Sequence, residues 1–106
     1  MAINIGSTLL DMLVLAVTDS EETYGYKITT EVKTAFEISE STLYPVLRRL
    51  LKDSLLESYD MEYQGRNRRY YKITNKGKAQ LRVYYEDWKA YKNNIDRILV
   101  TQKFEA

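Results

Sequence analysis

Cationic side chains gather in one stretch of the second half of the chain. Between Tyr63 and Tyr85 there is no acidic residue. The same stretch holds the basic residues Arg66, Arg68, Arg69, Lys72, Lys76, Lys78 and Arg82. Because arginine and lysine neutralise phosphate groups, such a stretch can follow a nucleic-acid backbone. Charges that protect an exposed strand edge are the simpler explanation, but edge protection does not require that acids be absent.

A second group of polar side chains lies on one face of an expected helix just before this stretch. The apolar residues there recur at helical spacing: Leu43, Val46, Leu47 and Leu50. Ser41, Tyr44 and Arg48 fall on the opposite side, where arginine can read guanine and hydroxyls can reach phosphates or base edges. A solvated helix face explains this pattern equally well by itself, and the neighbouring basic stretch favours DNA. Ser39 or Ser41 can cap the helix, and Pro45 favours Ser41, because proline fits best in a first turn.

The composition argues against an enzyme and against a metal site. The chain of 106 residues has no cysteine and no histidine, which removes thiol chemistry, the commonest general base and the commonest metal ligand. Glu21 and Glu22 are adjacent, but they lack metal-ligand spacing. The net charge is only +1, so the basic stretch rather than the whole chain would attract DNA. No signal peptide or membrane-spanning stretch is evident, and we expect a cytoplasmic protein with no cofactor.

The remaining pattern predicts the elements that position these groups. We expect helices over about 9–17, capped by Ser7 or Thr8, and over about 24–35, capped by Thr23. Two alternating β-rich runs, 59–63 and 69–74, then flank a turn at 64–67. The order of three helices and a basic hairpin is that of a winged helix-turn-helix. The fold class is therefore mainly α with a small β-hairpin, followed by one long helix.

The long helix is expected from about Asn75 toward Gln102, with Thr74 as its cap. A heptad seam runs along it through Leu81, Tyr84, Trp88, Tyr91, Ile95 and Ile98. A helix of about 40 Å cannot be covered by so small a domain, so the seam predicts a second chain. Trp88 is the only tryptophan, and we expect it in the dimer core. Alternatively, two copies held apart could sandwich a planar aromatic molecule.

Three blocks of sequence carry a family resemblance. They are YGYKI at 24–28, STLYPVLRRL at 41–50 and GRNRRYYKIT at 65–74. Together they resemble the PadR family of bacterial transcriptional regulators, over about residues 9–99. The resemblance implies a homodimeric repressor of the short-tailed branch, in which the last helix packs against the partner's first helix. Some members have an aromatic residue at the position of Trp88 beside drug-like effectors. Family members usually carry glycine where this chain has Ser54, which leaves the angle of the hairpin open.

These observations predict a winged helix-turn-helix over residues 7–74 and a dimerisation helix over 75–103. We predict contacts to a palindromic operator from Tyr26, Lys27, Ser39, Ser41, Thr42, Tyr44, Arg48, Gly65, Arg66, Arg68 and Lys72. Arg66 and Arg68 are preferred to Arg69, which alternates with buried positions, and the contact from Tyr26 competes with simple packing. The partners expected are double-stranded DNA, a second copy of the chain and a planar aromatic effector, with no membrane. The alternative function is a protein-interaction module that binds an acidic partner.

Overall fold

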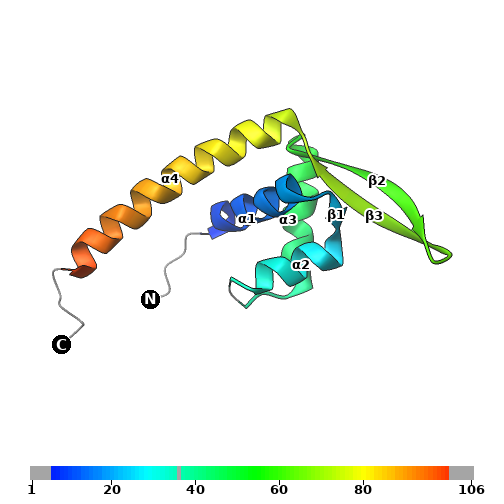
Figure 1. Ribbon diagram of the computed structural model, residues 1–106, viewed down its shortest axis with the longest axis horizontal. Helices are drawn as coiled ribbons and strands as arrows, with labels where there is room; N and C mark the ends of the chain where they lie inside the picture. The colour runs from blue at the N-terminus through cyan, green and yellow to red at the C-terminus, as the bar shows by residue number, and fades with distance from the viewer. Residues whose placement is uncertain (1–5, 36, 101–106) are drawn as a thin grey trace.

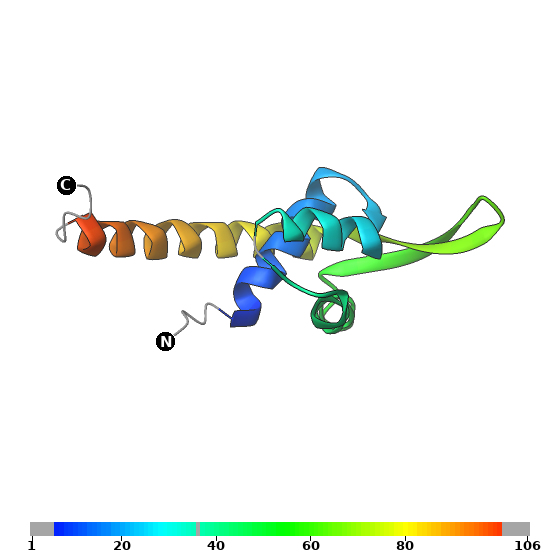
Figure 2. The ribbon, with the colours of Figure 1, turned by 90° about the horizontal axis from the view of Figure 1, so that it is seen from below.

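A computed structural model describes residues 6–35 and 37–100 (Figure 1). The elements follow one another as α1 (Gly6–Ser20), β1 (Thr23–Tyr24), α2 (Gly25–Lys33), α3 (Glu40–Lys52), β2 (Leu56–Tyr63), β3 (Arg66–Ile73) and α4 (Asn75–Val100). The prediction of a mainly helical chain with a small hairpin and a long last helix is confirmed. Figure 2 looks along α3 and shows the hairpin extending away from the helices.

The core forms around α1, which contacts α2, α3, α4 and β3. Val14 and Leu15 of α1 are completely buried, as are Ile28 of α2 and Leu43 of α3. The amphipathic stripe predicted for α3 is confirmed, because its four apolar residues all lie in this core. The middle of α1, residues 9–17, is apolar except for Asp11, and it is stable here because other elements cover it on several sides.

A short strand, β1, was not predicted. It pairs antiparallel with β3, through Thr23 opposite Tyr71 and Tyr24 opposite Tyr70, and gives a sheet of order β1-β3-β2. Two residues are too few to show an alternating pattern, so the sequence carries no signal for it. The predicted cap Thr23 is therefore wrong: Thr23 belongs to β1, and Tyr24 is the N-cap of α2 without a side-chain cap bond. The helix ends at Lys33 rather than Ala35.

The hairpin turn is shorter than the predicted 64–67. Only Gln64 and Gly65 form it, with φ angles of 53° and 78°, whereas Arg66 and Asn67 pair in register with β2. Two consecutive residues with positive φ are characteristic of a type I′ turn, whose twist matches that of the strands it joins. The wing therefore has eight residues in each strand.

The start of α3 also differs from the prediction. Ser39, not Ser41, is the N-cap, and its hydroxyl accepts a hydrogen bond from the backbone N–H of Thr42 at 3.3 Å. Pro45 consequently lies beyond the first turn, within the helix. It has no N–H to donate to the Ser41 carbonyl, which is the cost of starting the helix at Ser39. Ser41 itself is exposed, so water can satisfy that carbonyl.

The end of α3 keeps a left-handed turn in spite of its serine. Ser54 has a φ of 61°. The N–H of Leu55 donates to the Leu50 carbonyl at 2.9 Å, and the N–H of Ser54 donates to the Leu51 carbonyl at 3.0 Å. These two bonds form a Schellman motif, which normally has glycine at the left-handed position. The turn into the wing is therefore preserved, at the cost of backbone strain at Ser54.

The long helix α4 begins as predicted. The hydroxyl of Thr74 accepts a hydrogen bond from the N–H of Gly77 at 2.9 Å and donates to the Ser54 carbonyl at 2.7 Å. One side chain therefore both caps α4 and fastens it to the end of α3. Residues 101–103, the expected end of the dimerisation helix, lie outside the described residues. No helix within the described residues has the length and apolar character needed to cross a membrane.

Candidate nucleic-acid interface

The outer face of α3 is open to solvent. Ser41, Thr42, Tyr44 and Arg48 are all exposed there, opposite the buried leucines. Arg48 forms no ion pair within residues 6–35 and 37–100. An unpaired guanidinium on an exposed helix face can donate two parallel hydrogen bonds to guanine or to a phosphate. Three hydroxyl groups stand at the start of the same helix, since Ser39 lies 2.9 Å from the Ser41 oxygen and 3.0 Å from the Thr42 oxygen.

Gly25 of α2 lies close to the side chain of Tyr44 on α3. A Cβ placed on Gly25 would lie 3.2 Å from Cε1 of the Tyr44 ring. A glycine at the start of a helix suggests close approach to another backbone, but the neighbour of Gly25 is an aromatic side chain. Tyr44 therefore shares its surface between this contact and solvent, with 37% of the residue exposed.

Two of the predicted cationic contacts are paired with the acidic loop that precedes β1. Lys27 lies 3.4 Å from Glu21, and Lys72 lies 3.8 Å from Glu22. Glu22 also accepts a hydrogen bond of 2.7 Å from the Tyr59 hydroxyl. The two glutamates thus neutralise part of the basic surface. The positions of these residues along the chain could not predict the two ion pairs. Tyr26, the remaining predicted contact in this region, is 64% exposed and available.

The two faces of the wing point toward different parts of the molecule. Tyr71 lies on the face toward α3: burial raises the pKa of its hydroxyl, and the charges of Arg69 and Arg48 oppose that rise. Tyr59 and Lys72 lie on the other face, because both reach Glu22 in the loop before β1. Alternation along β3 places odd-numbered residues on the first face and even-numbered residues on the second.

Arg69 was set aside in the sequence prediction because it alternates with buried residues. The face of β3 that carries Arg69 is buried only near the helices, at Tyr71 and Ile73. Toward the tip of the wing Arg69 is exposed, with its guanidinium 3.5 Å from the carboxylate of Asp60 on β2. It therefore lies on the same side of the wing as α3. The position of Arg69 within the basic stretch could have indicated its exposure. The alternation of residues along β3, however, cannot show where the helices stop covering the strand.

The two arginines preferred in the prediction differ in their surroundings. Arg66 is exposed beside the turn and forms no ion pair in the described part of the chain. Arg68 is partly buried, with its guanidinium carbon 4.0 Å from the centre of the Tyr24 ring and 4.1 Å from that of Tyr63. The glycine between the strands, Gly65, has open space around its Cα.

A family model for the "Transcriptional regulator PadR-like family" matches residues 14–83 of this chain. The chain belongs to the PadR-like family of transcriptional regulators. The predicted resemblance is thereby confirmed, and with it the winged-helix fold and a general role in DNA-binding regulation of transcription.

Individual relatives agree with this membership. A transcriptional regulator of Mycobacterium tuberculosis is 36% identical over 86 residues, which cover 80% of this chain and 78% of the relative. A solved structure from Streptococcus mutans is 38% identical, covers 93% of both chains and has a TM-score of 0.85. A PadR-like transcriptional regulator from Bacillus cereus is 31% identical, with 86% of this chain and 91% of that chain covered and a TM-score of 0.79.

In this PadR-like chain the predicted heptad seam divides into two parts. Leu81 and Tyr84 pack against the hydrophobic core of the same chain. Trp88, Tyr91 and Ile95 are partly buried farther along α4, and Ile98 is 61% exposed. The first two positions therefore stabilise the domain itself, because α1 contacts α4 and α4 then continues past the end of α1 (Figure 1).

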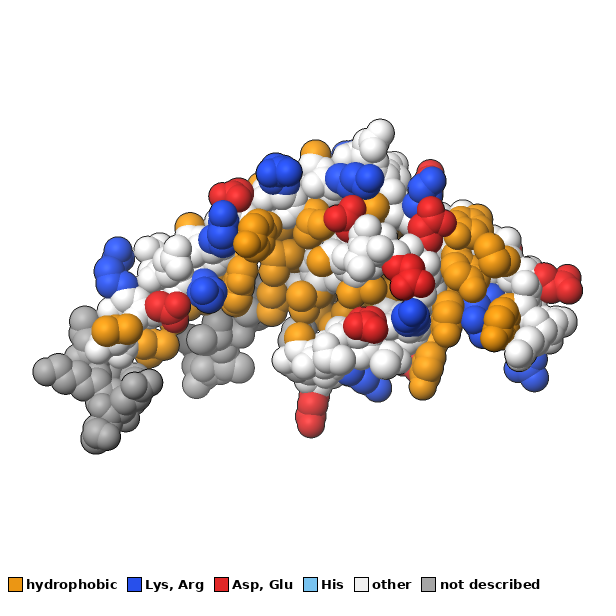
Figure 3. All heavy atoms as spheres, viewed as in Figure 1, with side chains coloured by type: hydrophobic (Ala, Val, Ile, Leu, Met, Phe, Trp, Pro, Cys, Tyr) orange, Lys and Arg blue, Asp and Glu red, His pale blue; other side chains and the backbone are white. Residues whose placement is uncertain are grey.

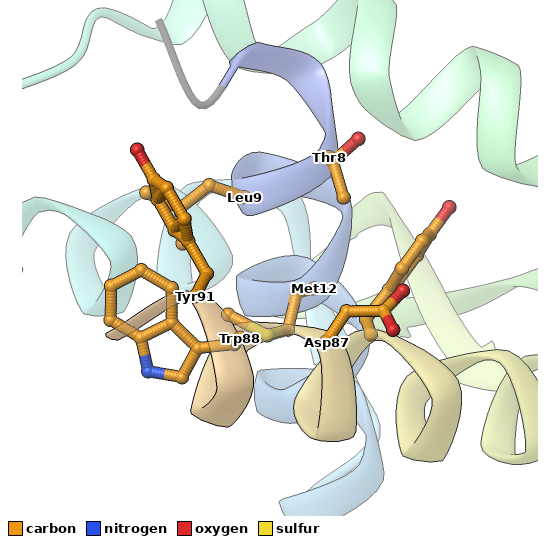
Figure 4. A pocket seen from close by; sticks show the side chains of 7 residues that line it. Thr8, Leu9, Met12, Asp87, Trp88 and Tyr91 are labelled. Atoms are coloured by element: carbon orange, nitrogen blue, oxygen red, sulfur yellow. The ribbon is translucent and has the colours of Figure 1, made fainter. Parts of the chain in front are cut away.

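Trp88 stands between two hollows where α1 and α4 diverge. One hollow of about 160 Å³ is lined by Leu9 and Met12 of α1 and by Tyr91 beside the indole (Figure 4). The other, of about 670 Å³, adjoins Met12 and Tyr85. The Trp88 and Tyr91 rings are tilted by 58° with centroids 6.2 Å apart. Figure 3 shows apolar side chains gathered in this gap, where a further aromatic surface could pack.

Proposed function

We propose that this PadR-like chain is a homodimeric repressor that binds a palindromic operator and is released by a small-molecule effector. The proposal depends on one observation: the exposed face of α3 and one face of the wing lie on the same side of the protein. Arg48 is exposed on α3, and Arg69 is exposed on the face of β3 that carries Tyr71, which packs in the same core as the inner residues of α3. A recognition helix beside a basic wing can bind a major groove and the adjacent backbone together.

In this proposal residues 7–74 form the unit that binds DNA. Arg48, with Ser41, Thr42 and Tyr44, reads base edges, whereas Arg66 and Arg69 bind phosphates. Tyr26 and Ser39 contribute hydroxyls near the backbone, and Gly65 allows the turn to approach it closely. Lys27, Lys72 and Arg69 take part only when phosphate displaces the carboxylates that they face, so we rank them below the unpaired Arg48 and Arg66.

The dimer is proposed from residues 75–103. The apolar side chains of α4 beyond Tyr84 are only partly buried or exposed within one chain, and pairing with a second copy would cover them. Val83, Tyr85, Leu99 and Val100 are between 45% and 74% exposed, which adds to the surface that a partner would bury. Two-fold symmetry then predicts half-sites about 34 Å apart, or a multiple of that distance.

Release by an effector is proposed because a chain of contacts joins the Trp88 region to α3. Tyr84 lines the smaller hollow and interacts with the Asp11 carboxylate. Asp11 in turn binds Arg49 on α3. A planar aromatic ligand beside Trp88 that shifts α4 would therefore act on the recognition helix and on the spacing of the two half-sites.

The test is a selection of duplexes from a random DNA pool at near-physiological salt. An enriched palindrome is the expected result, and its half-site spacing measures the geometry of the dimer. Retention of DNA without enrichment would overturn sequence-specific regulation and favour a basic surface that binds an acidic protein. A release assay with the selected operator and a panel of planar aromatic cations then tests the effector.

A further inference from the structure

Arg68 is surrounded by aromatic rings on the face of the wing that points away from α3. Its guanidinium lies over Tyr24, which belongs to β1, and over Tyr63, which ends β2 beside the turn. Tyr70 continues the group, with its ring 5.7 Å from Tyr24 and 5.6 Å from Tyr59. This guanidinium is therefore in contact with two rings of the protein itself, unlike that of the exposed Arg66.

The outer half of the wing has little other support. β1 pairs with β3 only at Tyr70 and Tyr71, so the strands beyond that point form a two-stranded ribbon. A ribbon of this kind has marginal stability by itself. Arg68 lies two residues beyond the last β1 pair and contacts both the sheet at Tyr24 and the end of β2 at Tyr63. It connects the tip of the wing to the body of the domain.

We propose that Arg68 is a positioning residue, a clip between Tyr24 and Tyr63 that holds the wing at its DNA-binding angle, and not a phosphate contact. The proposal rests on the proposed DNA-binding function and changes the role first expected of Arg68. Lysine cannot replace arginine in such a clip, because only the planar guanidinium stacks on two rings at once. Arg66, on the same face and the same strand, remains a candidate for the phosphate contact.

The salt dependence of DNA affinity separates the two roles. A side chain that neutralises one phosphate contributes about 0.9 to the slope of log affinity against log salt. Arg66→Met should therefore lower the slope by about one. Arg68→Met should leave the slope unchanged and weaken binding by about two- to fivefold, the size expected for an exposed cation–π contact. Arg68→Lys should show the same loss, and Tyr63→Leu should reproduce it without adding to Arg68→Met.

Backbone amide hydrogen exchange tests the clip without DNA. Arg68→Met and Tyr63→Leu should accelerate exchange at residues 60–67 and leave α1 and α3 unchanged, whereas Arg66→Met should not. A slope lowered by one in Arg68→Met, full binding by Arg68→Lys, or unchanged exchange at the tip would overturn the proposal. If the wild-type chain retains no duplex, the proposed function fails, and the exchange measurement still decides whether the clip exists.

Discussion

Arg49, on the inner side of α3, binds the carboxylate of Asp11 on α1. The two residues are 38 positions apart in the chain. The Asp11 side chain is only 10% exposed, whereas that of Arg49 is 39% exposed. Burial raises the pKa of the Asp11 carboxyl, and the neighbouring Arg49 guanidinium lowers it, with burial the larger effect. The helix α3 is thus joined to the centre of the domain through a carboxylate that, among residues 6–35 and 37–100, forms an ion pair with Arg49 alone.

Arg49→Met should destabilise the protein most at neutral pH. It leaves a buried carboxylate without its partner, and we expect a loss of about 2 kcal/mol at pH 7, below the range for fully buried pairs because Arg49 reaches solvent. Since the folded-state pKa of Asp11 then lies still farther above its unfolded value, the penalty should fall as the pH drops through the folded value and vanish below about 3.8. Urea unfolding of variant and wild type at pH 7 and pH 4 measures this difference.

The control for this prediction is the double variant Arg49→Met with Asp11→Asn. It should recover most of the stability at pH 7, because a neutral amide replaces the uncompensated charge. An equal loss for Arg49→Met at both pH values would mean that packing of the arginine, rather than charge, accounts for its contribution.

Ser54→Gly should stabilise the fold. The φ of 61° is strained for serine but not for glycine, and we expect a gain of about 1 kcal/mol in the free energy of unfolding. The Schellman bonds use only backbone groups and should persist. Ser54→Ala is the matched control, because alanine also has a Cβ, and thermal unfolding should show no gain for it. A destabilised glycine variant would contradict the strain argument.

Gly77→Ala should destabilise the junction between the wing and α4. A Cβ at this position would overlap the carbonyl oxygen of Leu55 and lie 2.8 Å from Cγ1 of Ile73. Neither neighbour is the end of a flexible side chain, so we expect a loss of about 3 kcal/mol. Lys78→Ala, at the next and exposed position, should change stability by less than about 0.5 kcal/mol. Equal unfolding midpoints for the two variants would refute the close approach.

Arg48→Ala should weaken binding to the selected operator by about tenfold or more and relax the preference at one base pair. The reason is that its unpaired guanidinium lies on the exposed face of α3. Fluorescence anisotropy with the operator and with single-base variants measures both effects. Lys92→Ala on the exposed side of α4 serves as the control. An equal loss on operator and random DNA would remove Arg48 from base reading and assign it to the backbone.

The fluorescence of Trp88 should report an effector directly. It is the only tryptophan, and it lies between the two hollows along α1 and α4. A planar aromatic cation that stacks on the indole should quench its emission in a saturable way. Met12→Phe is the matched control: its larger side chain fills the space between the hollows and adds no second indole, so it should abolish quenching while Trp88 remains the only tryptophan. No change with any member of a broad panel would leave Trp88 as a dimer contact alone.

Patterns within short stretches of this sequence were enough to predict the helices, the hairpin, the Thr74 cap and the family. Each of these features depends on residue spacing within one element or on a side chain that hydrogen-bonds to the backbone a few residues away. Residues that are close in sequence are therefore enough to predict them. The errors also have a local cause. Ser39 rather than Ser41 is the N-cap of α3, because its hydroxyl accepts a hydrogen bond from the Thr42 N–H. The strand Thr23–Tyr24 has only two residues, which is too short for an alternating pattern to be recognised.

The availability of each charge was decided only by the tertiary structure. The sequence by itself predicts DNA contacts from Lys27, Lys72 and Arg68 and ranks Arg69 below Arg68. The fold pairs the two lysines with glutamates, brings Arg68 over two tyrosine rings and leaves Arg69 exposed beside Asp60 on the other face of the wing. The physical reason is that a charge is neutralised or left available by elements that are distant in the chain and adjacent only after folding.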